Sequence, residues 1–216
     1  MVAKARSLTV MPVVSQSDDF SVRFVSTVDG MPDRNVQYIS QDSEGLMWLA
    51  GFKSVTRYDG YHFESVDVYL EALERVNGCH SDNAGGIILT TNTGRVMQGD
   101  IHGFQVVDVD GAMSGASCLK YLNWRGQHWM YDPLSGEVRV YDSAWSLLAQ
   151  TQLNTSWSSE PHAWASQIAL HPEGVVVLAD SSTLVVLDST VSVKSIARPD
   201  QEVFNCVCAS KLQAES

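Results

Sequence analysis

The histidines and cysteines of this chain are the side chains best suited to bind a metal or to form covalent links. The six histidines are separated along the sequence, and no two lie two or four residues apart, the spacings at which side chains of one element converge on a metal ion. The four cysteines, Cys79, Cys118, Cys206 and Cys208, form no C-x-x-C pair. Cys206 and Cys208 would share one face of a strand, where a disulfide between them would be strained. We therefore expect free thiols, no metal and no cofactor.

One segment has the residues of a known turn motif. Ser40, Asp42, Gly45 and Trp48 follow the order of the Asp-box of sialidase propellers, with one extra residue between Asp and Gly. A sialidase would also need several arginines around the substrate carboxylate and a tyrosine nucleophile near a glutamate. Most of the arginines fall within or beside predicted strands at unrelated positions: Arg34, Arg57, Arg75, Arg95, Arg125 and Arg139. We expect no enzymatic activity, and a degenerate sialidase-like glycosidase is an alternative.

The composition is that of a folded globular protein. Apolar residues make up 44% and charged residues 18% of the 216 residues, which supports a core that needs no disulfides. The net charge is −11 and the basic residues are scattered, so the electrostatic footprint of a nucleic-acid-binding protein is missing. No apolar run reaches the roughly 18 residues of a membrane span. Residues 1–19 are expected to be a flexible leader, with only a faint likeness to a signal peptide.

An internal repeat is the strongest signal along the chain. The clearest copy has a tight turn at 42–45 and is predicted to form a four-stranded antiparallel meander, with strands at 36–40, 46–50, 55–58 and 61–64. The same order of strand and turn residues returns three more times. The turn glycines of successive copies, Gly45, Gly85, Gly126 and Gly174, are 40 to 48 residues apart. This spacing is the blade period of a β-propeller. Only a weak stretch at 68–76 has a helical period, so we expect almost no helix.

The predicted fold is therefore all-β, with the meanders arranged as propeller blades. The domain spans 20–216, with blades at about 30–68, 69–112, 113–152 and 153–198 and a partial fifth blade from 199. Four to five blades would leave an incomplete ring with two unpaired edges, or a fragment of a larger propeller that another chain completes. Closure within one chain through a strand at 20–26 is the alternative.

The first copy resembles the two-component regulator propeller repeat of bacterial hybrid histidine kinases. The matching residues are Gly30-Met31-Pro32, Asn35-Val36, Asp42, Gly45, Trp48 and Tyr58-Asp59-Gly60. Ala50-Gly51 replaces the family's usual Gly-Thr, and the later copies lose the Gly-Leu-Pro step. The resemblance implies a periplasmic, extracytoplasmic sensor domain that takes part in signal transduction, often in the control of glycan use.

The repeat also predicts which side chains lie between the sheets. Trp48 and Trp129 occupy the same position in the second strand of their blades and are expected in the core. Burial is also expected for Val36, Ile39, Cys79, Leu89, Ile168 and Val177. Trp157 lies in a polar loop, where both stacking on a sugar ring and packing between blades are open.

The candidate site follows from propeller geometry. The loops that lead into the inner strands and the loops between second and third strands converge on one face near the axis, where functional surfaces usually lie. The candidate ligand-binding residues on these loops are Asp33, Arg34, Phe52, Lys53, Asn92, Tyr131, Asp132, Trp157 and His162. The aromatic residues are suited to stacking on a saccharide, and the charged ones to binding its hydroxyl or acidic groups.

Three functions remain open. The first is a sensor module that recognises a glycan or another small ligand, and the second is a scaffold propeller for protein interactions. The third is the degenerate glycosidase. The repeat has no Gly-His and no Trp-Asp dipeptide, which counts against a scaffold of the WD-repeat type. The expected partners are an oligosaccharide and a second copy or the remainder of a larger receptor, and not nucleic acid.

Overall fold

The structure is a computed structural model, and it describes residues 24–111, 113, 115–154, 157, 163–181 and 183–197. The leader expected at 1–19 and the partial fifth blade expected from 199 lie outside the described residues. Within those residues, no helix has the length and apolar character needed to cross a membrane.

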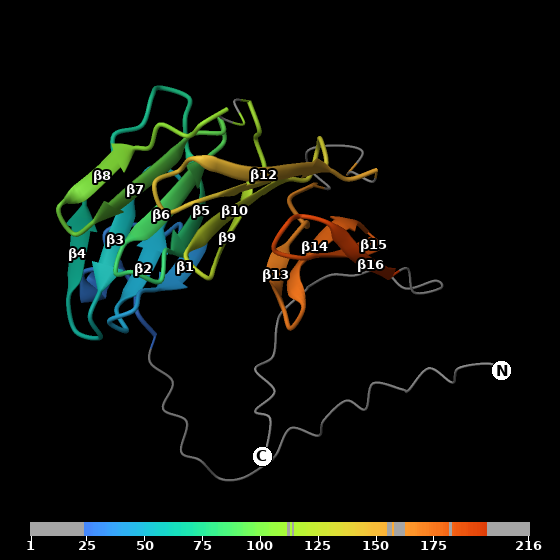
Figure 1. Cartoon of the computed structure of the whole chain (residues 1–216). Coiled ribbons are helices and arrows are strands. Elements are labelled where there is room, and N and C mark those ends of the chain that lie inside the picture. Colours follow the sequence, from blue (N-terminus) through green and yellow to red (C-terminus); the bar gives the residue numbers. More distant parts are fainter. Residues whose placement is uncertain are drawn as a thin grey trace, which may run out of the picture.

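Four antiparallel four-stranded sheets make up the chain, and they are arranged as blades of a β-propeller, as the repeat predicts (Figure 1). In every blade the strands are neighbours in chain order. Among the described residues, one 3-10 turn, η1 (Thr27–Asp29), precedes the first blade. The strands are β1 (Tyr38–Gln41), β2 (Met47–Ala50), β3 (Val55–Tyr58) and β4 (Phe63–Val66) in blade 1; β5 (Val76–Ser81), β6 (Ile87–Thr91), β7 (Val96–Asp100) and β8 (Gly103–Val106) in blade 2; β9 (Lys120–Trp124), β10 (Gln127–Asp132), β11 (Glu137–Tyr141) and β12 (Leu147–Gln152) in blade 3; and β13 (Ile168–His171), β14 (Gly174–Asp180), β15 (Thr183–Leu187) and β16 (Val193–Ala197) in blade 4.

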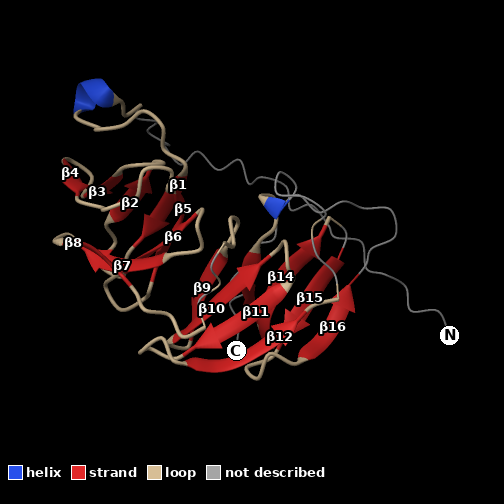
Figure 2. Cartoon of the chain, turned by 90° about the horizontal axis from the view of Figure 1, so that it is seen from above, coloured by secondary structure: helices blue, strands red, loops and turns tan. Residues whose placement is uncertain are grey.

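The blades follow one another around a common axis. The first strand of each blade is the innermost, and contacts run from β1 to β5, from β5 to β9 and from β9 to β13. Figure 2 shows the result as an arc of blades that is open between blade 1 and blade 4.

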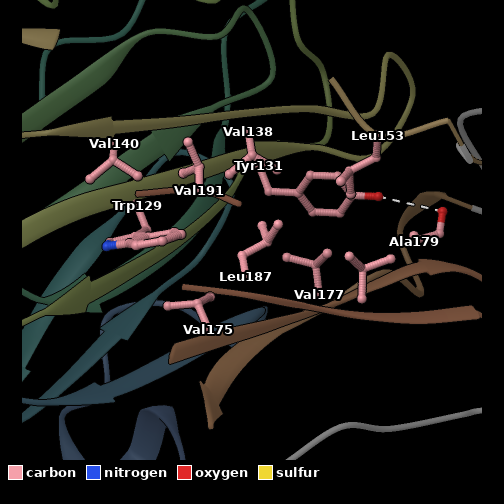
Figure 3. Packing of buried hydrophobic residues seen from close by; sticks show 11 residues of the cluster. Trp129, Tyr131, Val138, Val140, Leu153, Val175, Val177, Ala179, Leu187 and Val191 are labelled. Atoms are coloured by element: carbon pink, nitrogen blue, oxygen red, sulfur yellow. Dashed lines mark hydrogen bonds between the residues drawn. The ribbon is translucent and has the colours of Figure 1, made fainter. Parts of the chain in front are cut away.

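Apolar side chains fill the space between neighbouring blades. Trp129 and Tyr131 of β10 pack against Val175, Val177 and Leu187 of blade 4 (Figure 3). On the other side of the arc, Trp48, Cys79 and Leu89 belong to the cluster between blades 1 and 2. Burial is confirmed for Trp48, Cys79, Leu89, Trp129 and Val177, and burying one large apolar side chain contributes about 1.5–3 kcal/mol.

The expectation of burial is wrong for Ile39, whose side chain is 62% exposed. β1 pairs with β2 so that Tyr38 lies opposite Ala50 and Ile39 opposite Leu49. Since successive strand residues point to opposite faces, Tyr38 faces blade 2 and Ile39 faces away from it. Val36 and Ile168 are only half-buried. Val36 and Ile39 are three residues apart, so in one extended strand their side chains point to opposite faces. Such a strand cannot bury both against the same neighbouring blade.

The Asp-Gly turns that define the repeat have the same geometry in blades 1 and 2. Asp42 Oδ1 accepts hydrogen bonds from the backbone N–H groups of Glu44 and Leu46, at 3.0 and 2.9 Å. Asp82 Oδ1 accepts the equivalent bonds from Ala84 and Gly86, both at 2.8 Å. The aspartates therefore cap hairpin turns.

The Asp-box-like segment is one of these hairpins. Gly45 has φ 88°, a left-handed conformation that glycine adopts without strain. Trp48 Nε1 donates to Asp42 Oδ2 at 2.8 Å, so the tryptophan that follows the turn is tied to the aspartate that starts it. Asp42 and Trp48 thus have a structural role in holding the first hairpin of blade 1.

Candidate functional site

Three segments of the chain meet on one face, which we call the loop face. It is formed by the loops that lead into the inner strands and the loops between second and third strands. Phe52 lies in the β2–β3 loop, Arg75 directly precedes β5, and Trp164 lies in the connection to β13. The guanidinium carbon of Arg75 is 5.6 Å from the ring centroid of Phe52 and 5.7 Å from that of Trp164. Residues from the first blade and from the connection to the last described blade thus share one cation, and the three form a small aromatic and cationic surface.

Hydrogen bonds hold Arg75 in this place. Its backbone N–H donates to Asn92 Oδ1 at 2.7 Å, and its backbone C=O accepts from Asn92 N–H at 3.1 Å. The next N–H, of Val76, donates to the carbonyl of Phe52 at 2.9 Å. The loops of blades 1 and 2 are therefore fastened to each other through the Arg75 backbone, which fixes the point from which its side chain extends.

The guanidinium of Arg75 has no acceptor in the part of the chain that the structure describes. Its Nε is buried without a hydrogen-bond partner, and none of the described carboxylates forms an ion pair with it. Three other arginines are paired with acids: Arg57 with Glu64, Arg95 with Glu71 and Glu74, and Arg139 with Glu137. Buried polar groups in native proteins nearly always find partners, and Arg75 Nε is one of five buried side-chain atoms that lack one among the described residues. Arg139 is the other arginine among the five, and it still has an ion pair with Glu137.

Two lysines add positive charge to the same face. Lys120 Nζ donates to the carbonyl of Trp164 at 3.1 Å, and Lys53 Nζ donates to the carbonyls of Glu71 and Ala72 at 2.9 and 3.3 Å. Burial lowers the pKa of the Lys120 ammonium. Both lysines bind neutral carbonyl groups, so their charge is not cancelled by these contacts.

The two carboxylates of the loop that leads to Arg75 are held by another arginine. Glu74 is buried, accepts from Thr93 Oγ1 at 2.9 Å and forms an ion pair with Arg95. Glu71 lies 3.4 Å from the same guanidinium. The loop face therefore keeps a local positive charge at Arg75 and Lys120, although the chain as a whole carries −11.

A cavity of about 320 Å³ lies along the axis and is lined by all four inner strands. Its walls are partly apolar, with Ile39 and Leu170, and partly polar, with Ser40, His80 and Asn123. Burial, and to a lesser degree the charge of Lys120, lower the pKa of His80 to about 4. The cavity therefore contains a neutral imidazole at neutral pH. The described residues contain no group of three His, Cys, Asp or Glu side chains suited to a metal ion.

Five of the residues predicted for the site lie in loops of blade 1 and blade 2. Phe52 and Asn92 contact Arg75, and Lys53 binds the loop that leads to it. Asp33 accepts from Ser54 Oγ at 2.8 Å and from Asn35 N–H at 2.9 Å. These bonds lower the pKa of the Asp33 carboxyl. Arg34 is exposed.

The predicted residues of blades 3 and 4 have structural partners. The Tyr131 hydroxyl, fully buried, donates to the carbonyl of Ala179 at 3.4 Å (Figure 3). Asp132 accepts from the N–H groups of Leu134 and Ser135, at 3.0 and 3.3 Å. The nearly buried Trp157 donates from Nε1 to the carbonyl of Leu178 at 3.2 Å. The structure does not bring these three to Arg75, and His162 lies outside the described residues.

Sequence reasoning missed Arg75, Lys120 and Trp164 as members of the site. The sequence places Arg75 among arginines at unrelated strand positions, and no sequence pattern singled out Lys120 or Trp164. The available signal was that Arg75 and Lys120 stand at the loop ends of the inner strands β5 and β9, where propeller loops converge.

Comparisons with known proteins show the fold and no family. The sequence matches no protein-family model and no curated protein. Among solved structures, a catalytically inactive virginiamycin B lyase from Staphylococcus aureus with quinupristin is 10% identical, with a TM-score of 0.62 over 79% of this chain and 58% of the lyase. The Pan2 WD40 domain of Neurospora crassa is 12% identical, with a TM-score of 0.56 over 78% of this chain and 52% of that domain.

A third similar structure is apo AztD from Citrobacter koseri, which is 12% identical, with a TM-score of 0.55 over 79% of this chain and 49% of AztD. Across the solved structures compared, the chain spans 48 to 61% of their lengths. At these identities the likeness concerns the propeller fold alone.

Proposed function

We propose that this chain is a ligand-recognition module, without catalysis of its own, that binds a glycan or another small ligand on its loop face. The observation that carries the proposal is the arrangement of Phe52, Arg75 and Trp164. Both rings remain partly exposed, Phe52 at 39% and Trp164 at 36%. Exposed aromatic rings beside a fixed hydrogen-bond donor are the elements with which proteins bind sugar rings and other small polar ligands.

The sensor role rests on the resemblance of the first repeat to the two-component regulator propeller. The matching residues lie between Gly30 and Gly60. We propose on this basis that the module is extracytoplasmic and passes ligand binding to a signalling protein. A gene for a histidine kinase fused or adjacent to this one would support the proposal, and a cytoplasmic location of the tagged native protein would contradict it.

Binding to a glycan array, followed by titration calorimetry, tests the ligand-binding proposal. We expect wild-type protein to bind a member of the array, and both Trp164→Ala and Phe52→Ala to weaken that binding at least tenfold. Trp124→Ala is the matched control, because Trp124 lies at the opposite end of its blade and stacks on Arg125 at 4.7 Å. Binding that is unchanged in both loop-face variants, or lost equally in the control, would contradict the proposed site.

A second candidate function, a protein-interaction module, is favoured by the outer face of blade 1. This face, which points away from blade 2, contains a hollow of about 250 Å³ lined only by apolar surface. Tyr58 and Phe63 stack there with centroids 4.3 Å apart. The lining residues are Val25, Met31, Ile39, Met47, Leu49, Tyr58 and Phe63. Exposed apolar patches of this kind often mark protein contacts.

The mass in solution tests this second candidate. If a second copy binds the hollow, light scattering at rising concentration should show a dimer that Ile39→Asp removes. Leu148→Asp is the control, because Leu148 is a half-exposed apolar residue of blade 3 that lies outside the hollow. A monomer at all concentrations would exclude self-association through this face.

A further inference from the structure

We infer that the ligand of the loop face carries a carboxylate, which Arg75 binds and to which Lys120 adds a second positive charge. The inference deepens the proposed function and rests on it. The Arg75 guanidinium lies beside two aromatic rings, and no described residue accepts a hydrogen bond from its buried Nε. Aromatic rings attract the guanidinium through their π-electrons, but they offer no acceptor comparable to a carboxylate oxygen.

The carboxylates of the loops around Arg75 are bound to other groups. The carboxylates of Glu71 and Glu74 are engaged by Arg95, and Asp33 is engaged by Ser54 and by Asn35 N–H. Among the described residues no hydrogen bond or ion pair engages the Arg75 guanidinium. Within the described part of the chain, its Nη1–H and Nη2–H groups therefore remain able to donate to an acceptor that arrives from outside.

The geometry of the donor set favours a carboxylate. A guanidinium presents two parallel N–H groups, which match the two oxygens of a planar carboxylate. The ring centroids of Phe52 and Trp164 lie 5.6 and 5.7 Å from its carbon. The two rings leave apolar surface beside it for the ring that carries the acid.

Lys120 strengthens the preference for an anion. Its Nζ donates to the backbone carbonyl of Trp164 at 3.1 Å. Its charge also contributes to lowering the pKa of His80 in the axial cavity. In a chain with a net charge of −11, a distant anion is repelled. An acid is therefore attracted only near cations such as Arg75 and Lys120, which form no ion pair with the described carboxylates.

Matched acidic and neutral ligands test the inference with the full chain. The probes are oligogalacturonate and oligoglucuronate, each compared with its methyl ester, which has the same sugar and no charge. Sulfated galactose oligosaccharides form a third arm, which separates carboxylates from other anions. By calorimetry we expect at least one acid to bind tenfold or more tightly than its ester, and added salt to weaken only the acid.

Variants assign the effect to the two cations. Arg75→Gln should remove the difference between acid and ester, Lys120→Gln should reduce it by several-fold, and Arg75→Lys should retain part of it. Arg125→Gln is the control, because Arg125 lies at the opposite end of blade 3 beside Trp124. Circular dichroism and the urea midpoint show whether each variant is folded.

The outcomes separate this inference from the proposed function. Equal binding of acid and ester, or tighter binding of the sulfated sugars, would overturn the carboxylate inference while the module remained a ligand-binding one. An acid preference that survives Arg75→Gln would overturn the role of Arg75. Binding of no acidic or neutral saccharide would count against the proposed function itself.

Discussion

Replacing Asp82 by alanine should destabilise the protein far more than replacing Asp142, although both aspartates cap a hairpin in the same way. Asp142 Oδ1 accepts two backbone N–H groups, from Ala144 and Ser146, both at 2.9 Å. Asp82 makes the equivalent two bonds at 2.8 Å and, in addition, accepts from Gln98 Nε2 at 3.2 Å. Gln98 Oε1 in turn accepts from Trp145 Nε1 of blade 3 at 3.2 Å.

The difference in free energy follows from these contacts. Loss of the two turn bonds, which solvent can replace, should cost about 1 kcal/mol in Asp142→Ala. In Asp82→Ala the half-buried amide of Gln98 also loses its charged acceptor, and leaving this group unsatisfied adds up to about 1–3 kcal/mol. We therefore expect about 2–4 kcal/mol for Asp82→Ala, because the loss also weakens the link between blades 2 and 3.

Urea unfolding followed by tryptophan fluorescence measures both variants. Equal m-values with a lower midpoint would show a change in stability alone. Equal losses in Asp82→Ala and Asp142→Ala would refute the reasoning, because they would mean that the Asp82–Gln98–Trp145 chain contributes nothing. A change in the m-value of Asp82→Ala alone would indicate that blades 2 and 3 unfold separately.

Three further predictions concern single side chains. Burial lowers the pKa of His80 to about 4 while the unfolded chain keeps about 6.5, so the unfolded state takes up the proton first as the pH falls from 6.5 to 4. Wild type should thus lose more stability between pH 7.5 and 5 than His80→Gln, and equal losses in urea titrations would contradict this. A Cβ at Gly174 would lie 1.9 Å from the carbonyl oxygen of Leu187, whereas one at Gly60 would meet nothing within 4 Å. Gly174→Ala should cost at least about 2 kcal/mol and Gly60→Ala about 1 kcal/mol, as judged by thermal unfolding, and similar costs would show that this steric contact is relieved. Burial raises the pKa of the Cys79 thiol to about 12, so peptide mapping should find Cys79 unmodified by iodoacetamide at pH 8 until urea unfolds the protein; rapid labelling without urea would show that blade 2 opens.

The fold was predictable from the sequence because its signals are local. A hairpin is specified by a few consecutive residues. Asp42 and Asp82, together with the glycines that follow them, predict two turns that the structure contains. Trp48 and Trp129 repeat at equivalent positions and are both buried. The prediction that Ile39 is buried was wrong, because a strand of four residues shows too little alternation of apolar and polar residues to identify its buried face.

The candidate site was only partly predictable because it is assembled over long distances in the chain. Phe52 and Asn92 were placed on the loop face by their positions after β2 and β6. Arg75 and Trp164 meet although they are far apart in sequence, and their contact depends on how four blades curve around the axis. Tyr131 occupies a loop-end position, yet its hydroxyl is taken by Ala179 of blade 4, which no local pattern reveals.

The order of contacts along the arc has a consequence for local unfolding. Inner strands touch mainly the preceding and following blade, from β1 to β5, β9 and β13, so the molecule behaves approximately as a one-dimensional chain of coupled units. Blades 2 and 3 each have two neighbours among the described blades, whereas blades 1 and 4 have one. Native-state hydrogen exchange should therefore be slowest in β6 and β10 and should rise toward β4 and β16, as openings spread inward from either end of the arc.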